Sequence, residues 1–273
     1  MQETGNKATD KDHRKVTIRI GKGTLSFSTT DETALHKVVY EPYEVNRSIS
    51  MAANMREAFK TSPLLQDPFS LAVTLVDTPV LLVPINEFEE SEMQTLYHHS
   101  FTGIEYDTIL HHMLPALNTV AVYSLNKDLK GVIEEHFDDT RHYPLCTPVW
   151  KCLQAKNHVG HAKKLFAYAH HGSLELFAFA PNRFRFCNHF SAVHANDAVY
   201  YILHVWQQLG MKAETDELHV IGNLPEEKSA TEQLERFIAR VVRNSAAGLL
   251  QEAPVSRLKA MPFDLMAYHS NGI

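Results

Sequence analysis

The fold of this chain is decided by a stretch that occurs twice, first as Gly23-Thr24-Leu25-Ser26-Phe27 and again, 149 residues later, as Gly172-Ser173-Leu174-Glu175-Leu176. Each copy begins with a glycine and continues with alternating side chains, which is typical of a strand that leaves a tight turn. A second pair recurs at nearly the same distance, 146 residues, as Asp77-Thr78-Pro79 and Asn223-Leu224-Pro225. This recurrence predicts that the chain contains one structural unit twice.

The elements around both stretches follow the same order. In the first copy we expect strands over residues 16–20, 24–29 and 35–43, a helix over 50–60, a strand over 71–76 and a helix over 87–97. In the second copy we expect strands over 165–169, 174–180 and 184–190, a helix over 195–211, a strand over 218–221 and a helix over 228–242. The interleaving predicts an α/β fold. Three-strand meanders are common, so chance similarity is the alternative to duplication.

A further segment lies between the two copies. There we expect strands over residues 118–125 and 140–145, and helices over 127–137 and 147–156. Right-handed crossover connections would make these strands an extension of the first sheet.

This intervening segment resembles a known family. The runs Thr119-Val120-Ala121-Val122-Tyr123-Ser124-Leu125 and Arg141-His142-Tyr143-Pro144-Leu145 resemble the end of the first half of the type IV pilus actin-like assembly proteins. Over nearly its whole length the chain resembles an uncharacterised bacterial family of unknown function in the actin-like ATPase superfamily, most clearly at residues 203–210 and 217–222. The resemblance implies a duplicated ribonuclease-H-like fold, in which two β-meander/α/β halves face a cleft.

These observations divide the chain into four parts. We expect a disordered lead-in over residues 1–14, a first actin-like half over 15–160, a second half over 161–250 and a C-terminal tail over 251–273. The tail contains Pro254 and Pro262, which forbid one continuous helix, and it is too apolar for a solvated linker. It either packs on the protein itself, with the sheet of the second half as the favoured place, or docks on a partner.

In the superfamily, ATP lies in the cleft, and the first turn of each half wraps its phosphates and normally carries an aspartate for magnesium. Neither turn of this chain has an acid, and a later glycine pair is reduced to one glycine. The candidate site residues are Gly21, Lys22, Gly23 and Thr24 in the first turn, His171, Gly172 and Ser173 in the second, and Gly222. Magnesium-dependent phosphoryl transfer would lack its metal ligands. We therefore predict no cofactor, with weak nucleotide binding by backbone N–H groups and Lys22 as the alternative.

Histidine is abundant, with 17 residues, and includes the adjacent pair His170-His171 and the pair His158 and His161. Neighbouring residues of a strand point to opposite faces, so an adjacent pair rarely binds one ion. Neither HExxH nor CxxC occurs, so the sequence predicts no metal site. We expect His170 and His171 to be exposed in the second turn, and Cys146 and Cys187 to be buried thiols.

Composition restricts the class of protein further. The net charge is −6, which argues against a nucleic-acid partner. No apolar run approaches the roughly 18 to 20 residues of a membrane span, so membrane insertion is not expected. Three cysteines, an odd number in a chain of this length, favour reduced thiols and a cytoplasmic location.

Two functions fit this sequence. One is a non-catalytic actin-like protein that acts as an interaction or scaffold module for an unidentified protein partner. The other is a nucleotide-dependent enzyme, an ATPase or small-molecule kinase, with an atypical phosphate site built from residues such as Lys22, Thr24, Ser173 and Gly222. The oligomeric state is open.

Overall fold

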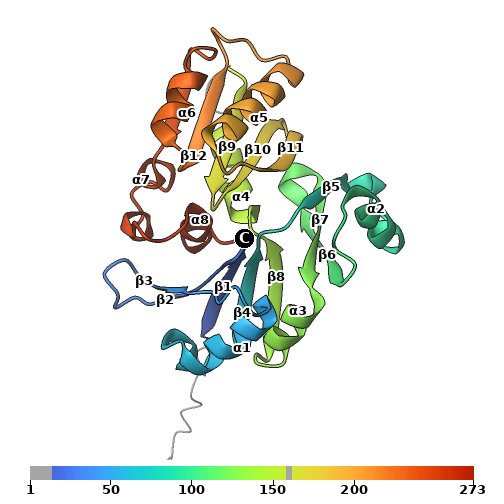
Figure 1. Cartoon of the computed structure of the whole chain (residues 1–273), viewed down its shortest axis with the longest axis vertical. Helices are drawn as coiled ribbons and strands as arrows, with labels where there is room; N and C mark the ends of the chain where they lie inside the picture. Colours follow the sequence, from blue (N-terminus) through green and yellow to red (C-terminus); the bar gives the residue numbers. More distant parts are fainter. Residues whose placement is uncertain (1–13, 158–161) are drawn as a thin grey trace, which may run out of the picture.

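The structure is a computed structural model that describes residues 14–157 and 162–273 of the 273-residue chain. Except for Arg14, the predicted lead-in lies outside the described residues, as do His158 and His161. The described residues form two five-stranded sheets, one above the other in Figure 1, and a smaller three-stranded sheet. Within the same residues, no helix is long and apolar enough to cross a membrane.

The first sheet is built by β1 (Lys15–Gly21), β2 (Thr24–Thr30), β3 (Val38–Tyr43), β4 (Leu71–Val76) and β8 (Asp139–Pro144). Their spatial order is β3-β2-β1-β4-β8, with antiparallel pairing in the meander and parallel pairing from β1 to β4 and β8. The predicted meander is confirmed. The third strand begins three residues later than expected.

Strand β1 is buried on both faces, and its two faces differ in chemistry. Val16, Ile18 and Ile20 pack in one core with α1 (Met51–Thr61) and α3 (Lys127–Glu134). Because side chains alternate along a strand, Thr17 and Arg19 point to the opposite face, where they are also buried. Strand β1 therefore presents polar side chains toward the second half, beside apolar side chains of its neighbour β4, Val73 and Leu75.

The prediction that residues 118–125 extend the first sheet is wrong. They form β7 (Thr119–Asn126), which pairs with β5 (Val80–Pro84) and β6 (Asp107–Leu114) in a separate antiparallel sheet of order β5-β7-β6. The apolar run of β7 finds partners in two strands that we did not predict. Residues 140–145 do extend the first sheet, as β8.

The helix expected over residues 87–97 is also shorter than predicted. Single 3-10 turns at Ile85–Glu87 and Glu90–Glu92 precede α2 (Met93–Ser100). Four glutamates lie between residues 87 and 92, and like charges three residues apart destabilise a helical turn. The helix therefore begins only after them.

The second sheet contains β9 (Lys164–His170), β10 (Ser173–Ala180), β11 (Arg183–Ser191), β12 (Glu217–Gly222) and β13 (Val241–Asn244). Its order, β11-β10-β9-β12-β13, and its strand directions match those of the first sheet. Its outer face packs on α5 (Ala195–Gln208) and α6 (Glu227–Leu234). The helix predicted over residues 228–242 ends at Leu234. Residues 235–240 connect it to the fifth strand of the sheet, which begins at Val241.

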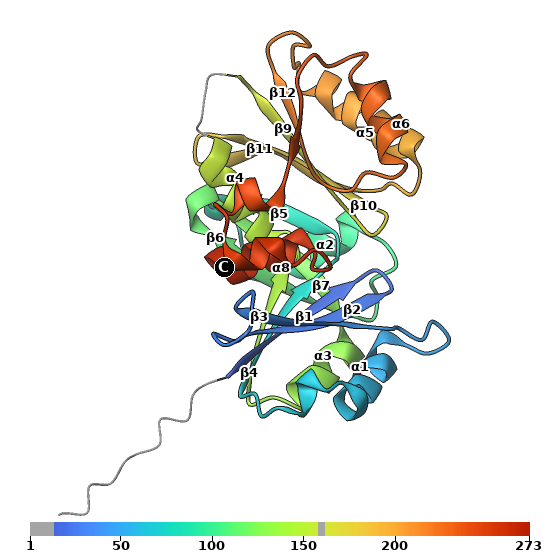
Figure 2. The ribbon, with the colours of Figure 1, turned by 90° about the vertical axis from the view of Figure 1, so that its left-hand side faces the viewer.

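The C-terminal segment lies between the two halves (Figure 2). After α7 (Ala246–Leu249) and a 3-10 turn at Pro254–Arg257, the chain forms α8 (Phe263–Asn271), which packs against α4 (Thr147–Asn157). Apolar residues of α8 join one core with side chains of both sheets. The tail thus packs on the protein itself, as favoured, but against both halves and not on the second sheet alone.

Candidate functional site

A cleft of about 590 Å³ lies below the carboxyl ends of β9, β12 and β13. Its walls also include Tyr40 of β3 and the segment from Lys259 to Phe263. Of the eight predicted site residues, His171 and Gly222 line this cleft. The other six are not among the residues of its wall: Gly21, Lys22, Gly23, Thr24, Gly172 and Ser173.

Gly222 occupies a position that no other residue could take without a shift of the backbone. Its φ is +76°, and a Cβ atom there would lie 2.1 Å from the carbonyl oxygen of Ala169. The glycine lets β12 end directly against β9 at the wall of the cleft.

Both predicted turns are tight hairpins. In the first, Gly23 has φ +71°, Lys22 is exposed, and a Cβ on Gly21 would lie 2.2 Å from Thr24 Oγ1. In the second, His171 and Gly172 have φ values of +45° and +78°, as the two central residues of a type I′ turn require. Both sets of glycines are therefore accounted for by the turns themselves.

His170 does not lie exposed in the second turn, as we predicted, because it is the last residue of β9. Its side chain is 3% exposed, and it stacks on Tyr168 with 4.7 Å between ring centres. His171 is exposed, as expected. The hairpin needs only two connecting residues, so the strand continues through His170 and directs this side chain toward the first half.

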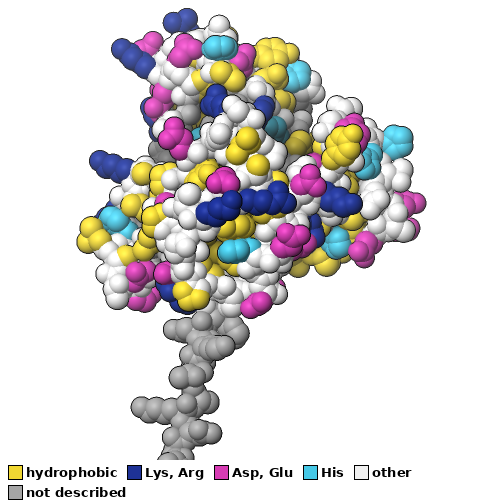
Figure 3. Space-filling view, turned by 60° about the horizontal axis from the view of Figure 1, so that its bottom comes forward, with side chains coloured by type: hydrophobic (Ala, Val, Ile, Leu, Met, Phe, Trp, Pro, Cys, Tyr) yellow, Lys and Arg dark blue, Asp and Glu magenta, His cyan; other side chains and the backbone are white. Residues whose placement is uncertain are grey.

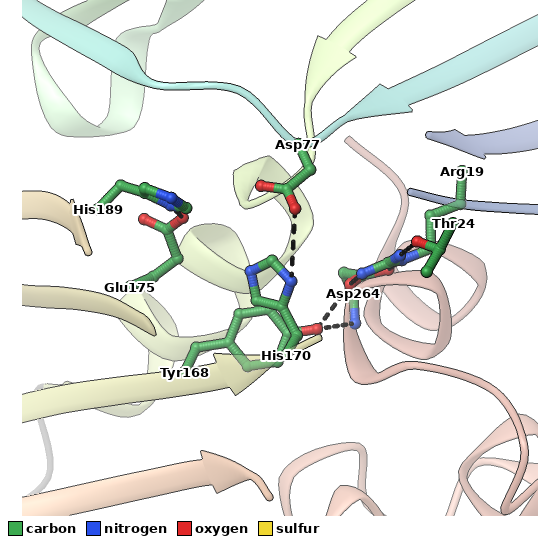
Figure 4. Close-up of polar contacts among 8 residues, drawn as sticks. All are labelled: Arg19, Thr24, Asp77, Tyr168, His170, Glu175, His189 and Asp264. Atoms are coloured by element: carbon green, nitrogen blue, oxygen red, sulfur yellow. Dashed lines mark hydrogen bonds and ion pairs between the residues drawn. The ribbon is translucent and has the colours of Figure 1, made fainter. Parts of the chain in front are cut away.

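An ion pair that the sequence analysis missed lies between the two sheets, beside Thr24 at the end of the first turn (Figure 4). Arg19 of β1 donates from Nε and Nη2 to the two carboxylate oxygens of Asp264 in α8, at 2.9 Å each. The hydroxyl of Tyr168, in β9, donates to Asp264 Oδ2 at 2.6 Å. Arg19 Nη1 also lies 3.4 Å from Thr24 Oγ1. One carboxylate thus joins the first sheet, the second sheet and the C-terminal helix.

This ion pair is held away from water. The exposed fractions of the Arg19 and Asp264 side chains are 2% and 0%. Burial acts to raise the pKa of Asp264, but the charge and hydrogen bonds of Arg19 outweigh it and hold that pKa below its usual value. Burial and the adjacent Asp264 carboxylate raise the pKa of Tyr168 well above its usual value. Asp264 is therefore a buried carboxylate anion, and the guanidinium of Arg19 compensates its charge.

The described residues around the turns do not fit a magnesium nucleotide complex. Neither turn offers a carboxylate, and the guanidinium that could hold a phosphate is already paired with Asp264. A phosphate at this place would have to displace a fully buried carboxylate that accepts three hydrogen bonds. We derive no reaction step through a nucleotide.

A second polar group lies beside the ion pair. Figure 4 shows the carboxylate of Asp77 directed at His170, and His189 next to Glu175. Asp77 Oδ2 is 3.8 Å from His170 Nδ1, and His189 Nδ1 is 2.5 Å from Glu175 Oε1. Among the described residues, these side chains and Cys146 form the groups whose spacing suits a metal ion.

A protein-family model described as a protein of unknown function, DUF3822, matches residues 3–241. The chain belongs to this family. The DUF3822 protein is similar to a Bacteroides thetaiotaomicron protein with an actin-like ATPase fold and unknown function, at 23% identity and a TM-score of 0.80, over 93% of this chain and 95% of that one. It is also similar to a chain of the PilM-PilN type IV pilus biogenesis complex, at 12% identity and a TM-score of 0.58, over 94% of this chain and 98% of that chain.

A search of the curated proteins finds no match to the DUF3822 protein. The family and the actin-like fold predicted from the sequence are confirmed.

The residues that the sequence analysis missed carried a signal. Arg19 is the charged member of the alternating run over residues 16–20, and Asp264 is the acid within the apolar stretch from Met261 to Tyr268. A charged side chain in a buried pattern requires a partner of opposite charge. That rule predicts an oppositely charged partner for each residue, but it does not say which one, and it gives no account of Tyr168.

Proposed function

We propose that this DUF3822 protein is a non-catalytic, cytoplasmic member of the actin-like fold that serves as a binding platform for another protein. The observation that carries the proposal is the Arg19–Asp264 pair, because the protein's own C-terminal helix supplies the anion between the two turns. In an ATPase of this fold, a bound nucleotide would supply that charge. The cytoplasmic location is supported by three unpaired cysteines.

A protein partner is supported by the likeness to the PilM-PilN complex, in which a protein of this fold is assembled with a second protein. The surface of the DUF3822 protein also fits a protein partner better than a nucleic acid. On the face shown in Figure 3, a row of Lys and Arg side chains is bordered by Asp and Glu side chains. Binding to nucleic acid generally uses a basic surface of one sign.

The first test of the proposal is calorimetric titration of the full chain with ATP and magnesium, together with an assay of ATP hydrolysis. We expect no saturable heat change and no turnover. Micromolar, magnesium-dependent binding with turnover would overturn the proposal in favour of a nucleotide-dependent enzyme. In that case Lys22→Ala should abolish binding, whereas Lys60→Ala, a change of an exposed lysine on α1, should not.

The second test addresses the platform itself. The full chain, used as bait in lysate from its native cells, should retain the same protein in near-equal amounts with and without prior removal of ATP. Retention that requires ATP would contradict a non-catalytic platform, and so would the absence of any reproducible partner.

A further inference from the structure

Five side chains of the types that bind transition metals converge where the two halves meet. They are Asp77, Cys146, His170, Glu175 and His189. The ligand atoms of Cys146, His170 and Glu175 all lie within 4.8 Å of one another, and so do those of Asp77, Glu175 and His189. Glu175 belongs to both sets, so the five side chains form one continuous group.

The strand register explains why the second half contributes three of them. The two-residue turn at His171 and Gly172 places Glu175 directly opposite Tyr168, and Glu175 is in turn opposite His189. Residues two apart in a strand share a face, so His170 points the same way as Tyr168. This face of the second sheet is directed at the first half, where Tyr168 and neighbouring side chains join the shared core.

The first half contributes the other two at the ends of parallel strands. Asp77 directly follows β4, and Cys146 follows β8 by two positions. Because β4 and β8 are parallel neighbours, their carboxyl ends meet at the same edge of the sheet. Five strands from two halves thus bring acidic, thiol and imidazole groups together.

Two of these side chains are buried without hydrogen-bond partners. The His170 side chain is 3% exposed and neither ring nitrogen has a partner, and the Asp77 side chain is 4% exposed and its Oδ2 has none. Their closest approach, 3.8 Å, is too long for a hydrogen bond. Buried polar groups in native proteins nearly always have partners, and a ligand between these two would supply one.

A small cavity lies among these groups. Its volume is about 10 Å³, and Asp77, Cys146 and Glu175 are among the residues that line it, whereas His170 is not. A metal ion bound by Cys146 would release the proton of the thiol to solvent, because the thiolate is the form that coordinates.

We propose that Cys146, His170 and Glu175, whose ligand atoms lie within 4.8 Å of one another, bind one divalent transition-metal ion of the zinc type, which joins the two halves of the protein, with Asp77 beside the site. Thiolate and imidazole ligands together with carboxylates favour zinc, whereas magnesium favours sites made of oxygen atoms. His189, whose Nδ1 is 2.5 Å from Glu175 Oε1, holds the carboxylate of that ligand in place. The absence of a metal motif from the sequence reflects the spacing of the three ligands, which span residues 146 to 175.

The experiment starts with the full chain, freed of metal by a chelator and titrated with Zn²⁺ in competition with a chromophoric chelator. The wild type should bind one equivalent, and excess Mg²⁺ should not displace it. Cys146→Ser should weaken binding roughly tenfold or more. The matched control is Cys152→Ser, which removes a buried thiol of α4 outside the cluster and should leave the affinity unchanged.

Two further measurements keep the test independent of folding defects. Co²⁺ in place of Zn²⁺ should give the near-ultraviolet absorption of a cobalt–thiolate bond in the wild type and in Cys152→Ser, but not in Cys146→Ser. Zn²⁺ should raise the Tm of the wild type but not that of Glu175→Gln, which keeps the shape of the side chain. The proposal is overturned if the wild type binds no Zn²⁺, or if Cys146→Ser and Cys152→Ser bind it equally well.

Discussion

The ion pair between Arg19 and Asp264 makes the sharpest prediction about stability. Asp264→Asn keeps the size of the side chain but removes the charge that compensates a guanidinium with 2% exposure. Breaking a buried pair by removing one partner costs about 3–5 kcal/mol, because the other charge stays buried. One end of the asparagine amide would also present N–H groups to Arg19, so at least one of the two 2.9 Å hydrogen bonds is lost. We expect the free energy of unfolding to fall by that amount.

The assay is urea unfolding followed by tryptophan fluorescence. Trp150 is buried in α4, within the core that α8 completes, so its emission reports the region where the pair lies. The matched control is Asp67→Asn, which breaks an Arg–Asp pair of the same 2.9 Å length whose side chains are 45% and 52% exposed. An exposed pair is worth roughly 1 kcal/mol or less, so this variant should unfold close to the wild type.

A double variant separates the pair from general damage to the core. Arg19→Met combined with Asp264→Leu removes both charges, and replacement of a buried pair by apolar side chains is often neutral. The double variant should therefore be more stable than Asp264→Asn alone. The reasoning is refuted if Asp264→Asn costs no more than Asp67→Asn, or if the effects of removing each charge simply add.

Three other positions make predictions about stability. Gly222→Ala should destabilise the protein by about 2 kcal/mol or more, since φ is +76° and the new Cβ would meet the Ala169 carbonyl oxygen. Gly131→Ala, in the open interior of α3, should instead stabilise the protein by about 0.5–1 kcal/mol. A change of the unfolding free energy with the same sign in both variants, measured by urea unfolding, would contradict this account. Burial, with a smaller effect from the charge of Lys15, lowers the pKa of His269 to about 4, so below pH 6.5 the unfolded chain binds a proton that the folded protein excludes. The free energy of unfolding should thus fall as the pH falls from 6.5 to 4, by on the order of 3 kcal/mol from this group. An equally steep pH profile of the unfolding free energy in His269→Gln would disprove this assignment to His269.

The meanders were predictable because their signal is local. Alternation of side chains and a glycine at the turn mark β1 with β2, and β9 with β10, without any knowledge of the rest of the chain. The register of the second hairpin was not predicted, because the expected strands left His170 in the turn, whereas the two-residue turn places Glu175 opposite Tyr168. The fold class was therefore within reach of the sequence.

The end of the second half shows where periodicity fails. Leu234, Ile238 and Val241 continue a helical spacing, yet α6 ends at Leu234 and Val241 begins a strand. A short strand of four residues is too brief to show its own alternation. The exposed Phe237, at 61%, lies in the connection between the two elements. Pairing with β12, which is a tertiary contact, decides the structure here.

The candidate site was out of reach for a different reason. Arg19 and Asp264 are 245 residues apart, and the Asp77–His170 contact joins two halves whose approach depends on α4 and α8. The superfamily resemblance directed attention to the two turns, which contain no acidic residue. The paired charges lie elsewhere, because Arg19 is on strand β1 and Asp264 is on the C-terminal helix α8.

The two buried polar groups together bear on how this fold would work without a nucleotide. Here Asp264 links Arg19 of the first sheet to Tyr168 of the second through hydrogen bonds internal to the protein. The proposed metal ion would join the same two halves through Cys146 and Glu175. Neither connection uses a nucleotide, so both fit the proposed binding platform, whose halves would keep one relative position with or without ATP.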